Sequence, residues 1–224
     1  MPLRRSEAFI LRTYSFKESD RIVVFFTRDF GKLRGVARGA RRPKSKFGAT
    51  LEPLTQVRVE FFEREGRDLC AVDDCELLAS PLATSAADLL HAVAVSLIAE
   101  VADRMLPEAE VSPVAFRLLV AVTAALRQSP SGDGPWLALT YYLYWMVRIG
   151  GFLPPLELTP AATQLASSLA TRALASLDAA LDPDTAAAAA SAPGRQLRQR
   201  LKTCLEEHLE SHLRAWPMLA TLET

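Results

Sequence analysis

Residues 7–39 read EAFILRTYSFKESDRIVVFFTRDFGKLRGVARG. Two runs in this stretch, at 7–14 and 21–28, are rich in β-branched and aromatic residues and are bounded by turn-forming residues, and a third run at 32–39 follows closely. The pattern predicts three consecutive strands, of which the third returns beside the second as the arm of a hairpin.

Two further strands are predicted at 56–63 and 68–78, joined by a hairpin turn at 64–67 in which Gly66 can adopt a positive φ. Five short antiparallel strands within about 80 residues tend to close on themselves, because open sheet edges invite aggregation. We therefore expect a five-stranded barrel of the OB type, a fold that commonly binds oligonucleotides or oligosaccharides on one face.

After Pro81 the hydrophobic period changes from two to about four, as in the series Leu89, Val93, Leu97 and Val101. Helices are predicted at 84–106 (with Ser85 as N-cap), 112–128, 135–150, 161–177 and 195–216, and a loop or marginal helix at 182–194. The predicted fold is α+β and multidomain: an N-terminal OB-type barrel (residues 1–80) followed by an all-α helical domain (residues 81–224).

The 224-residue chain has no net charge, yet its cations are concentrated near one end. Residues 1–50 carry 13 Lys and Arg against 4 Asp and Glu, whereas residues 51–80 carry 3 against 8. A cluster of one sign is typical of a surface that binds a polyanion, while a merely solvated face normally mixes both signs. The candidate nucleic-acid contacts are Lys32, Arg34, Arg38, Arg41, Arg42, Lys44 and Lys46, of which Lys32, Arg34, Arg38 and Arg42 are expected to share one strand face.

Aromatic rings beside a cationic groove are the usual stacking partners of single-stranded bases. Most rings of the first 80 residues are needed to fill the barrel. Tyr14, Phe16 and Phe47 lie in or beside predicted loops and are the candidates for stacking, with core packing as the alternative for each.

The cysteine and histidine pattern predicts neither a disulfide framework nor a metal site, and no cofactor is expected. Cys70 and Cys75 are five residues apart in a predicted strand, which should direct them to opposite faces. Cys204, His208 and His212 are spaced four apart on a predicted helix but have no fourth ligand nearby.

No catalytic motif is present: the chain has no phosphate-binding loop of the form G-x-x-x-x-G-K-[ST], no G-x-S-x-G and no C-x-x-C. Asp73 and Asp74 are adjacent in a strand and should point apart. We expect a protein that is not an enzyme. No apolar run approaches the ~18 residues of a membrane span and no signal peptide is visible, so a cytoplasmic protein without a membrane partner is expected.

The first 50 residues resemble the RecO family of bacterial recombination-mediator proteins. The ordered pattern that carries the resemblance is Glu18-Ser19, Phe26-Thr27, Gly31-Lys32-Leu33 and Ala37-Arg38-Gly39-Ala40-Arg41. GGFLPPL at 150–156 is similar to the segment that follows the family's central helices, and the leucine-rich helix after Gly194 resembles its C-terminal helix.

The resemblance implies a DNA-binding OB barrel joined to a helical domain, acting in DNA repair and homologous recombination by the RecF pathway. Family members bind and anneal DNA strands without ATP. With RecR, and often RecF, they load RecA onto strands coated by single-stranded-DNA-binding protein, whose acidic C-terminal tail they bind. The implied partners are thus single- and double-stranded DNA, RecR, RecF and that tail, in the cytoplasm at the nucleoid.

For the tail we predict an apolar pocket within 111–150 with Arg127 and Arg148 at its rim, because an acidic peptide needs a cation there. Many family members carry a four-cysteine zinc cluster after the 150–156 segment, but residues 157–195 contain no cysteine, so zinc is not implied. An OB-fold RNA-binding or translation-linked module remains one alternative, because DNA and RNA phosphates present the same charge to Lys and Arg. A purely scaffolding interaction protein is the other.

Overall fold

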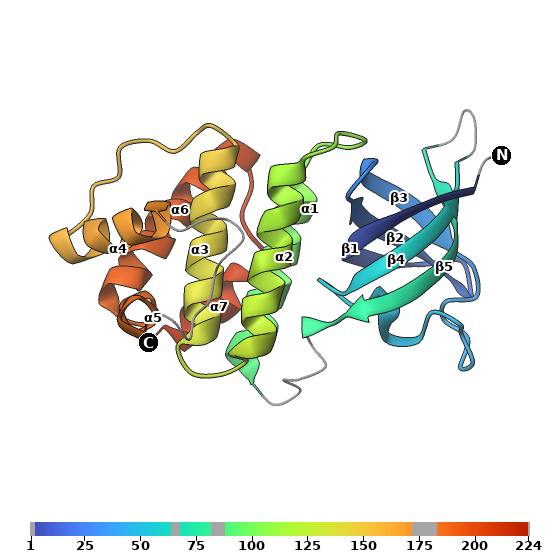
Figure 1. The fold of residues 1–224 in the computed structure, drawn as a ribbon, viewed down its shortest axis with the longest axis horizontal. Coiled ribbons are helices and arrows are strands. Elements are labelled where there is room, and N and C mark those ends of the chain that lie inside the picture. The colour runs from blue at the N-terminus through green and yellow to red at the C-terminus, as the bar shows by residue number, and fades with distance from the viewer. Residues whose placement is uncertain (1–2, 64–67, 82–87, 172–182, 224) are drawn as a thin grey trace. The chain divides into compact units, whose positions relative to one another are not determined.

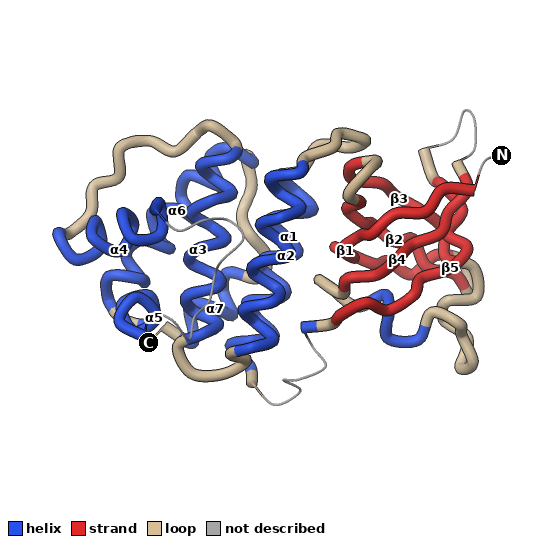
Figure 2. The backbone as a smooth tube through the Cα atoms, in the orientation of Figure 1, coloured by secondary structure: helices blue, strands red, loops and turns tan. Residues whose placement is uncertain are grey.

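The structure is a computed structural model that describes residues 3–63, 68–81, 88–171 and 183–223. The predicted hairpin turn at 64–67 and the predicted N-cap Ser85 lie outside the described residues. Figure 1 shows strands in the first part of the chain and helices in the rest, and Figure 2 separates the two kinds of element by colour. The predicted α+β fold class is confirmed.

The five strands form a closed barrel in the order β1-β2-β3-β5-β4, and β1 pairs with β4 to close it. All pairs are antiparallel except β3 with β5. This is the predicted OB-type barrel. The strands are β1 (Leu3–Phe16), β2 (Asp20–Thr27), β3 (Gly31–Ala37), β4 (Gln56–Phe62) and β5 (Cys70–Ala79).

The first strand closes the barrel because it serves two neighbours. Its segment 3–9 pairs with β4 and its segment 8–16 pairs with β2, and the register shifts between Ile10 and Arg12. Such an irregularity bends a strand and increases its twist, which lets one long strand turn the corner of a small barrel.

The barrel interior is filled by alternate residues of the strands. Val57, Val59 and Phe61 of β4 are all fully buried, and Phe25 of β2 meets the Phe61 ring edge-on with centroids 5.8 Å apart. The predicted apolar face of this strand is therefore the core face.

The prediction that Cys70 and Cys75 face opposite sides is wrong, because both belong to the barrel core. Glu60 of β4 pairs with Asp74 and Phe61 pairs with Val72, so Asp73 is an extra residue in β5. A bulge of this kind reverses the alternation, and Asp73 and Asp74 both lie between inward-facing residues. Burial raises the pKa of each thiol to about 12.

The helices are α1 (Leu89–Met105), α2 (Pro113–Gln128), α3 (Gly134–Ile149), α4 (Pro160–Thr171), α5 (Pro183–Ala190), α6 (Ala192–Leu209) and α7 (Trp216–Leu222), and a 3₁₀ turn, η1, spans Gly48–Leu51. The low-complexity segment 182–194, for which a loop or a marginal helix is predicted, supplies α5 and the start of α6, so the helical alternative is the one present. One prediction differs. The predicted helix 195–216 ends at Leu209, because Glu210 adopts a left-handed conformation with φ 50°.

The chain divides into two compact units that do not follow chain order. The barrel unit contains residues 1–80 and 102–116, and the helical unit contains residues 81–101 and 117–224. The predicted single boundary after residue 80 missed the contribution of 102–116 to the barrel unit. Phe116 is 2% exposed, and its ring centroid lies 5.2 Å from that of Phe9 and 6.0 Å from that of Phe26. None of the described helices is long and apolar enough to cross a membrane.

Helix α3 contains an aromatic run whose burial leads to a stability prediction. Tyr142 is fully buried, and within the described residues its hydroxyl has no hydrogen-bond partner. Replacing Tyr142 by Phe removes an unpaired buried polar atom, so it should raise the free energy of unfolding by about 1 kcal/mol, measured by urea denaturation. The matched change Thr140→Val should lower it, because the Thr140 hydroxyl donates to Trp136 O at 2.7 Å and accepts from Arg198. A loss of stability in Tyr142→Phe would contradict this account.

Candidate nucleic-acid interface

The outer surface of the barrel carries a row of side chains that crosses all five strands. Strand register pairs Tyr14 with Ile22, Ile22 with Val36, Val36 with Ala71, and Ala71 with Phe62. Paired residues point to the same side of a sheet, and none of these five is fully buried. This apolar row therefore lies on the outside and includes the β2–β3 face with which OB-folds bind oligonucleotides.

Cations flank the apolar row on both sides. Arg12 pairs in register with Val24 and Val24 with Arg34, so both arginines lie in the next row of the same face. The Arg12 guanidinium lies over the Tyr14 ring, 4.4 Å from its centroid. On the other side the chain leaves β3 directly into Arg38, which is exposed. An apolar strip between cations suits a single strand, whose bases can stack while its phosphates meet the charges.

The segment 38–47, here called the basic loop, is attached to the turn between β1 and β2. The Gly39 N–H donates to the Asp20 carboxylate at 2.9 Å, and the Arg41 N–H donates to Ser19 O at 2.9 Å. The hydrogen bond from Gly39 is the main reason why the pKa of Asp20 is lowered. These contacts hold the start of the basic loop against the turn that precedes β2.

Besides Lys46, four cations of the basic loop are exposed: Arg38, Arg41, Arg42 and Lys44. Among the described residues none of them forms an ion pair with an acid. The expectation that Arg38 and Arg42 continue a strand face is wrong, because β3 ends at Ala37 and both arginines lie in turns. The four charges are therefore presented by an anchored loop.

Two of the predicted nucleic-acid contacts, Lys32 and Arg34, already interact with other protein groups of the barrel unit. Lys32 is 8% exposed, and its ammonium donates to the backbone oxygen of Asp103, while burial lowers its pKa. Arg34 is partly exposed, and its guanidinium lies 2.9 Å from the Glu108 carboxylate. Segment 102–116 thus covers Lys32, which leaves the candidate set, and places an acid beside Arg34.

The three aromatic candidates have different environments. Phe47 is 1% exposed and belongs to the barrel core, so it anchors the end of the basic loop and offers no ring for stacking. Tyr14 is 36% exposed at the end of the apolar row. Phe16 is half-buried, with the Lys17 ammonium 5.4 Å from its ring centroid. Of the three, Tyr14 presents the most accessible ring beside cations.

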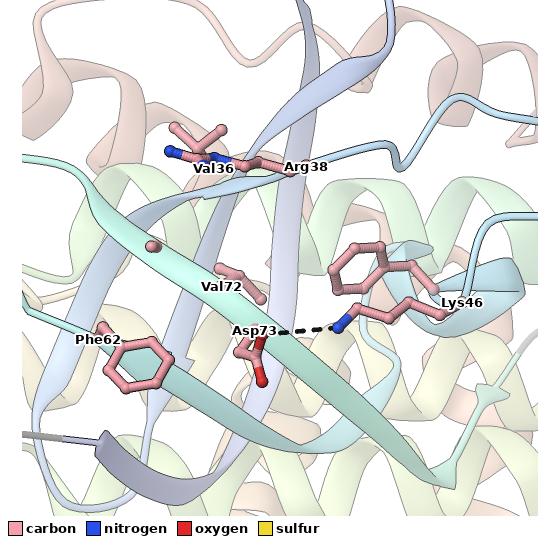
Figure 3. A pocket seen from close by; sticks show the side chains of 8 residues that line it. Val36, Arg38, Lys46, Phe62, Val72 and Asp73 are labelled. Atoms are coloured by element: carbon pink, nitrogen blue, oxygen red, sulfur yellow. Dashed lines mark ion pairs between the residues drawn. The ribbon is translucent and has the colours of Figure 1, made fainter.

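Lys46 is exposed at the far end of the basic loop, and its ammonium lies 3.6 Å from the Asp73 carboxylate. Figure 3 shows this ion pair beside Phe62 and below Val36 and Arg38. The bulge in β5 places Asp73 on the outer surface, so the cation and the acid border the same end of the apolar row.

The two arginines predicted for an acidic tail are not brought together. Arg127 lies in the last turn of α2 and Arg148 in the last turn of α3. Figure 1 shows α3 returning antiparallel to α2, which places these ends apart by about the length of the 16-residue helix, roughly 24 Å. The Arg148 guanidinium lies over the Trp145 ring, 4.9 Å from its centroid.

The histidines of α6 and its neighbourhood make contacts with other groups. The His208 ring stacks on Phe152 with centroids 4.1 Å apart, and His212 Nδ1 lies 3.2 Å from the Glu206 carboxylate. Within the described residues no group of three or more His, Cys, Asp or Glu side chains is arranged to hold a metal ion.

Sequence reasoning did not identify Ile22, Val36, Phe62 and Asp73 as surface residues of the site. Each of the first three is an apolar residue in a strand, and from the sequence alone such a residue is assigned to the core. Strand register distinguishes these outward-facing residues from core residues, and it is known only once β3 is paired with β5. The outward position of Asp73 depends in addition on the bulge in β5.

Comparison with known proteins matches both the barrel and the first helices to the two domain models of one protein family. Residues 1–81 match the family model described as Recombination protein O N terminal, and residues 86–158 match that described as Recombination protein O C terminal. A protein of Koribacter versatilis named DNA repair protein RecO is 44% identical over 154 residues, which cover 69% of this chain and 61% of that protein.

Two Bifidobacterium proteins carry the same name. That of Bifidobacterium animalis is 40% identical over 151 residues (67% of this chain, 62% of that protein), and that of Bifidobacterium longum is 38% identical over 173 residues (75% and 72%). The chain spans about three fifths of the Koribacter and Bifidobacterium animalis proteins. On these matches, and on the barrel that precedes the helices, the chain belongs to the RecO family.

Proposed function

We propose that this chain is a non-catalytic mediator of DNA repair and homologous recombination that binds DNA on the outer face of its barrel. The observation that carries the proposal is the apolar row from Tyr14 to Phe62, bordered by Arg12 and Arg34 on one side and by the basic loop on the other. The names of the relatives, DNA repair protein RecO, support the choice of DNA as the ligand.

The proposed binding mode favours single strands. An apolar row on an open sheet face can contact the flat surfaces of bases only if they are not already stacked in a duplex. The cations of the basic loop contact phosphates, which single and double strands share, so duplex DNA is also bound but uses fewer of these groups. A cationic surface that binds phosphates of both single and double strands also lowers the repulsion between two complementary strands, which supports annealing, and no step of it needs ATP.

The proposal extends to partners through the family. We propose that the chain acts with RecR and RecF to load RecA onto strands coated by single-stranded-DNA-binding protein, and that its helical unit binds that protein's acidic tail. Because Arg127 and Arg148 lie at opposite helix ends, they cannot both lie at the rim of one small pocket. Single variants of each, titrated with a tail peptide, decide which arginine takes part.

The experiment that tests the proposal is strand annealing without ATP. Complementary oligonucleotides, bare or coated with single-stranded-DNA-binding protein, are mixed with the chain, and duplex formation is followed by fluorescence quenching. We expect annealing at least about ten times faster than the spontaneous rate. Binding of a matched RNA oligonucleotide with no acceleration of DNA annealing would favour the RNA-binding alternative.

A further inference from the structure

A pocket of about 410 Å³ opens at one end of the apolar row, on the outer surface of the barrel. Its apolar wall comes from Val36, Phe62 and Ala71, which are neighbours in register across β3, β4 and β5. Figure 3 shows the ion pair between the lining residues Lys46 and Asp73, with Phe62 on the opposite side of Asp73 from Lys46. The pocket is therefore apolar on one side and charged on the other.

The β3–β5 contact explains why a hollow forms at this position. These two strands are parallel and pair only at Gly35, Val36 and Ala37 of β3. Beyond Ala37 the chain turns away into the basic loop, and among the described strands none continues the pairing with β5 on that side, where Asp73 bulges outward. The same departure of the chain brings Lys46 back to the edge of the hollow.

The dimensions and chemistry of the pocket match one unstacked nucleobase. Pockets that enclose small organic ligands have volumes of about 300–1,000 Å³, and this volume lies near the lower limit. Phe62 offers a ring at the pocket wall, while Arg38 and Lys46 at the rim can meet the phosphates on either side of the base. A duplex cannot enter, because its bases present only their edges.

The acid selects among bases. A carboxylate only accepts hydrogen bonds, and the N4 amino group of cytosine donates to such an acceptor. Thymine carries a carbonyl oxygen at the equivalent position, which the carboxylate repels. Resting on the DNA-binding function proposed above, we propose that this pocket holds one base of the bound single strand and that Asp73 makes it prefer cytosine to thymine.

The test compares the affinities of a cytosine 20-mer and a thymine 20-mer, measured by fluorescence anisotropy at neutral pH. The two are pyrimidines of similar size, so the comparison isolates the base edge. Wild-type protein should bind the cytosine strand about five-fold more tightly, the lower end of the usual discrimination because Asp73 is partly solvated.

Two variants locate the preference. Asp73→Asn should remove it, since an amide can turn to match either base, while affinity for both strands rises because a negative charge is lost. Asp74→Asn is the matched control: it removes the same charge from the same bulge but does not line the pocket, so the preference should remain. Phe62→Ala should lower the affinity for both strands at least about five-fold.

The outcomes separate this inference from the function on which it rests. If wild-type protein binds neither strand, the DNA-binding proposal itself fails. If it binds both strands equally well, or if Asp73→Asn keeps the wild-type preference, DNA binding stands and the base pocket is wrong. A surface substitution at Asp73 should shift stability by no more than ~0.5 kcal/mol, so unfolding does not obscure the result.

Discussion

Replacing Arg38, Arg41, Arg42 and Lys44 together by alanine should flatten the salt dependence of single-stranded DNA binding by two to three units of log affinity against log salt. Each phosphate neutralised on a single strand contributes a slope of about −0.7, because its condensed counterions are released. Four exposed loop cations that each contact a phosphate account for a change of this size. Affinity at low salt should fall for every base sequence alike, since phosphates carry no sequence information.

The variant should remain folded, because the basic loop is held by groups that the substitutions retain. The loop's attachments are the backbone N–H groups of residues 39 and 41 and the buried ring of Phe47. Exposed substitutions away from such anchors usually change stability by no more than ~0.5 kcal/mol each. Thermal unfolding of the variant should therefore resemble that of wild type.

A matched four-fold variant in the helical unit provides the control. Arg148, Arg195, Arg200 and Arg214 are all exposed, and their joint replacement by alanine removes the same formal charge. This variant should keep the wild-type slope within about one unit. Equal losses in both variants would show that net charge alone governs binding, and a wild-type slope in the loop variant would place the DNA path elsewhere.

The architecture could be predicted because it depends on local patterns. Period-two strands separated by turn residues, followed by period-four helices, specify a small barrel and a helical region, and both are present. The basic loop could be predicted for the same reason: its charges lie close together in the sequence, and a loop of one sign between two strands stays on the surface.

The rest of the site depends on contacts between residues far apart in the chain. A lysine is normally a surface residue, but Lys32 is covered by Asp103, which lies 71 positions away in the sequence. Phe47 lies within the basic loop and reads as an exposed ring, yet burying it gains more free energy than leaving it in solvent. The position of Asp73 depends on one extra residue in β5, which no periodicity indicates.

In the helical unit, replacing Glu223 by alanine should lower the free energy of unfolding by about 3–5 kcal/mol, because it leaves a buried guanidinium without its counter-charge. Arg198 is 1% exposed, and its Nε and Nη2 atoms lie 2.7 and 2.6 Å from Glu223 Oε1. Burial lowers the pKa of Arg198, and the Glu223 carboxylate opposes that effect. The ion pair therefore offsets the free-energy cost of burying the Arg198 charge in the helical unit.

The other contacts of Arg198 explain why the effect should reach several helices. Its Nη1 donates to the Thr140 hydroxyl of α3 at 2.9 Å and to the backbone oxygen of Ala189 in α5, and its guanidinium lies over the Trp136 ring, 4.3 Å from the centroid. Without Glu223, the cation must either stay buried and unpaired or draw away from all three partners. Loss of one carboxylate thus loosens α3, α5 and α6 together.

A double variant distinguishes a lost ion pair from lost packing. Replacing Arg198 by Met together with Glu223 by Leu removes both charges and keeps apolar volume, so it should recover most of the stability that Glu223→Ala loses. Glu207→Ala, an exposed acid on α6, should change the free energy of unfolding by less than ~0.5 kcal/mol. Urea denaturation of the three variants decides the matter. If Glu223→Ala costs no more than Glu207→Ala, the guanidinium finds solvent without penalty, and the pair does not hold the helical unit together.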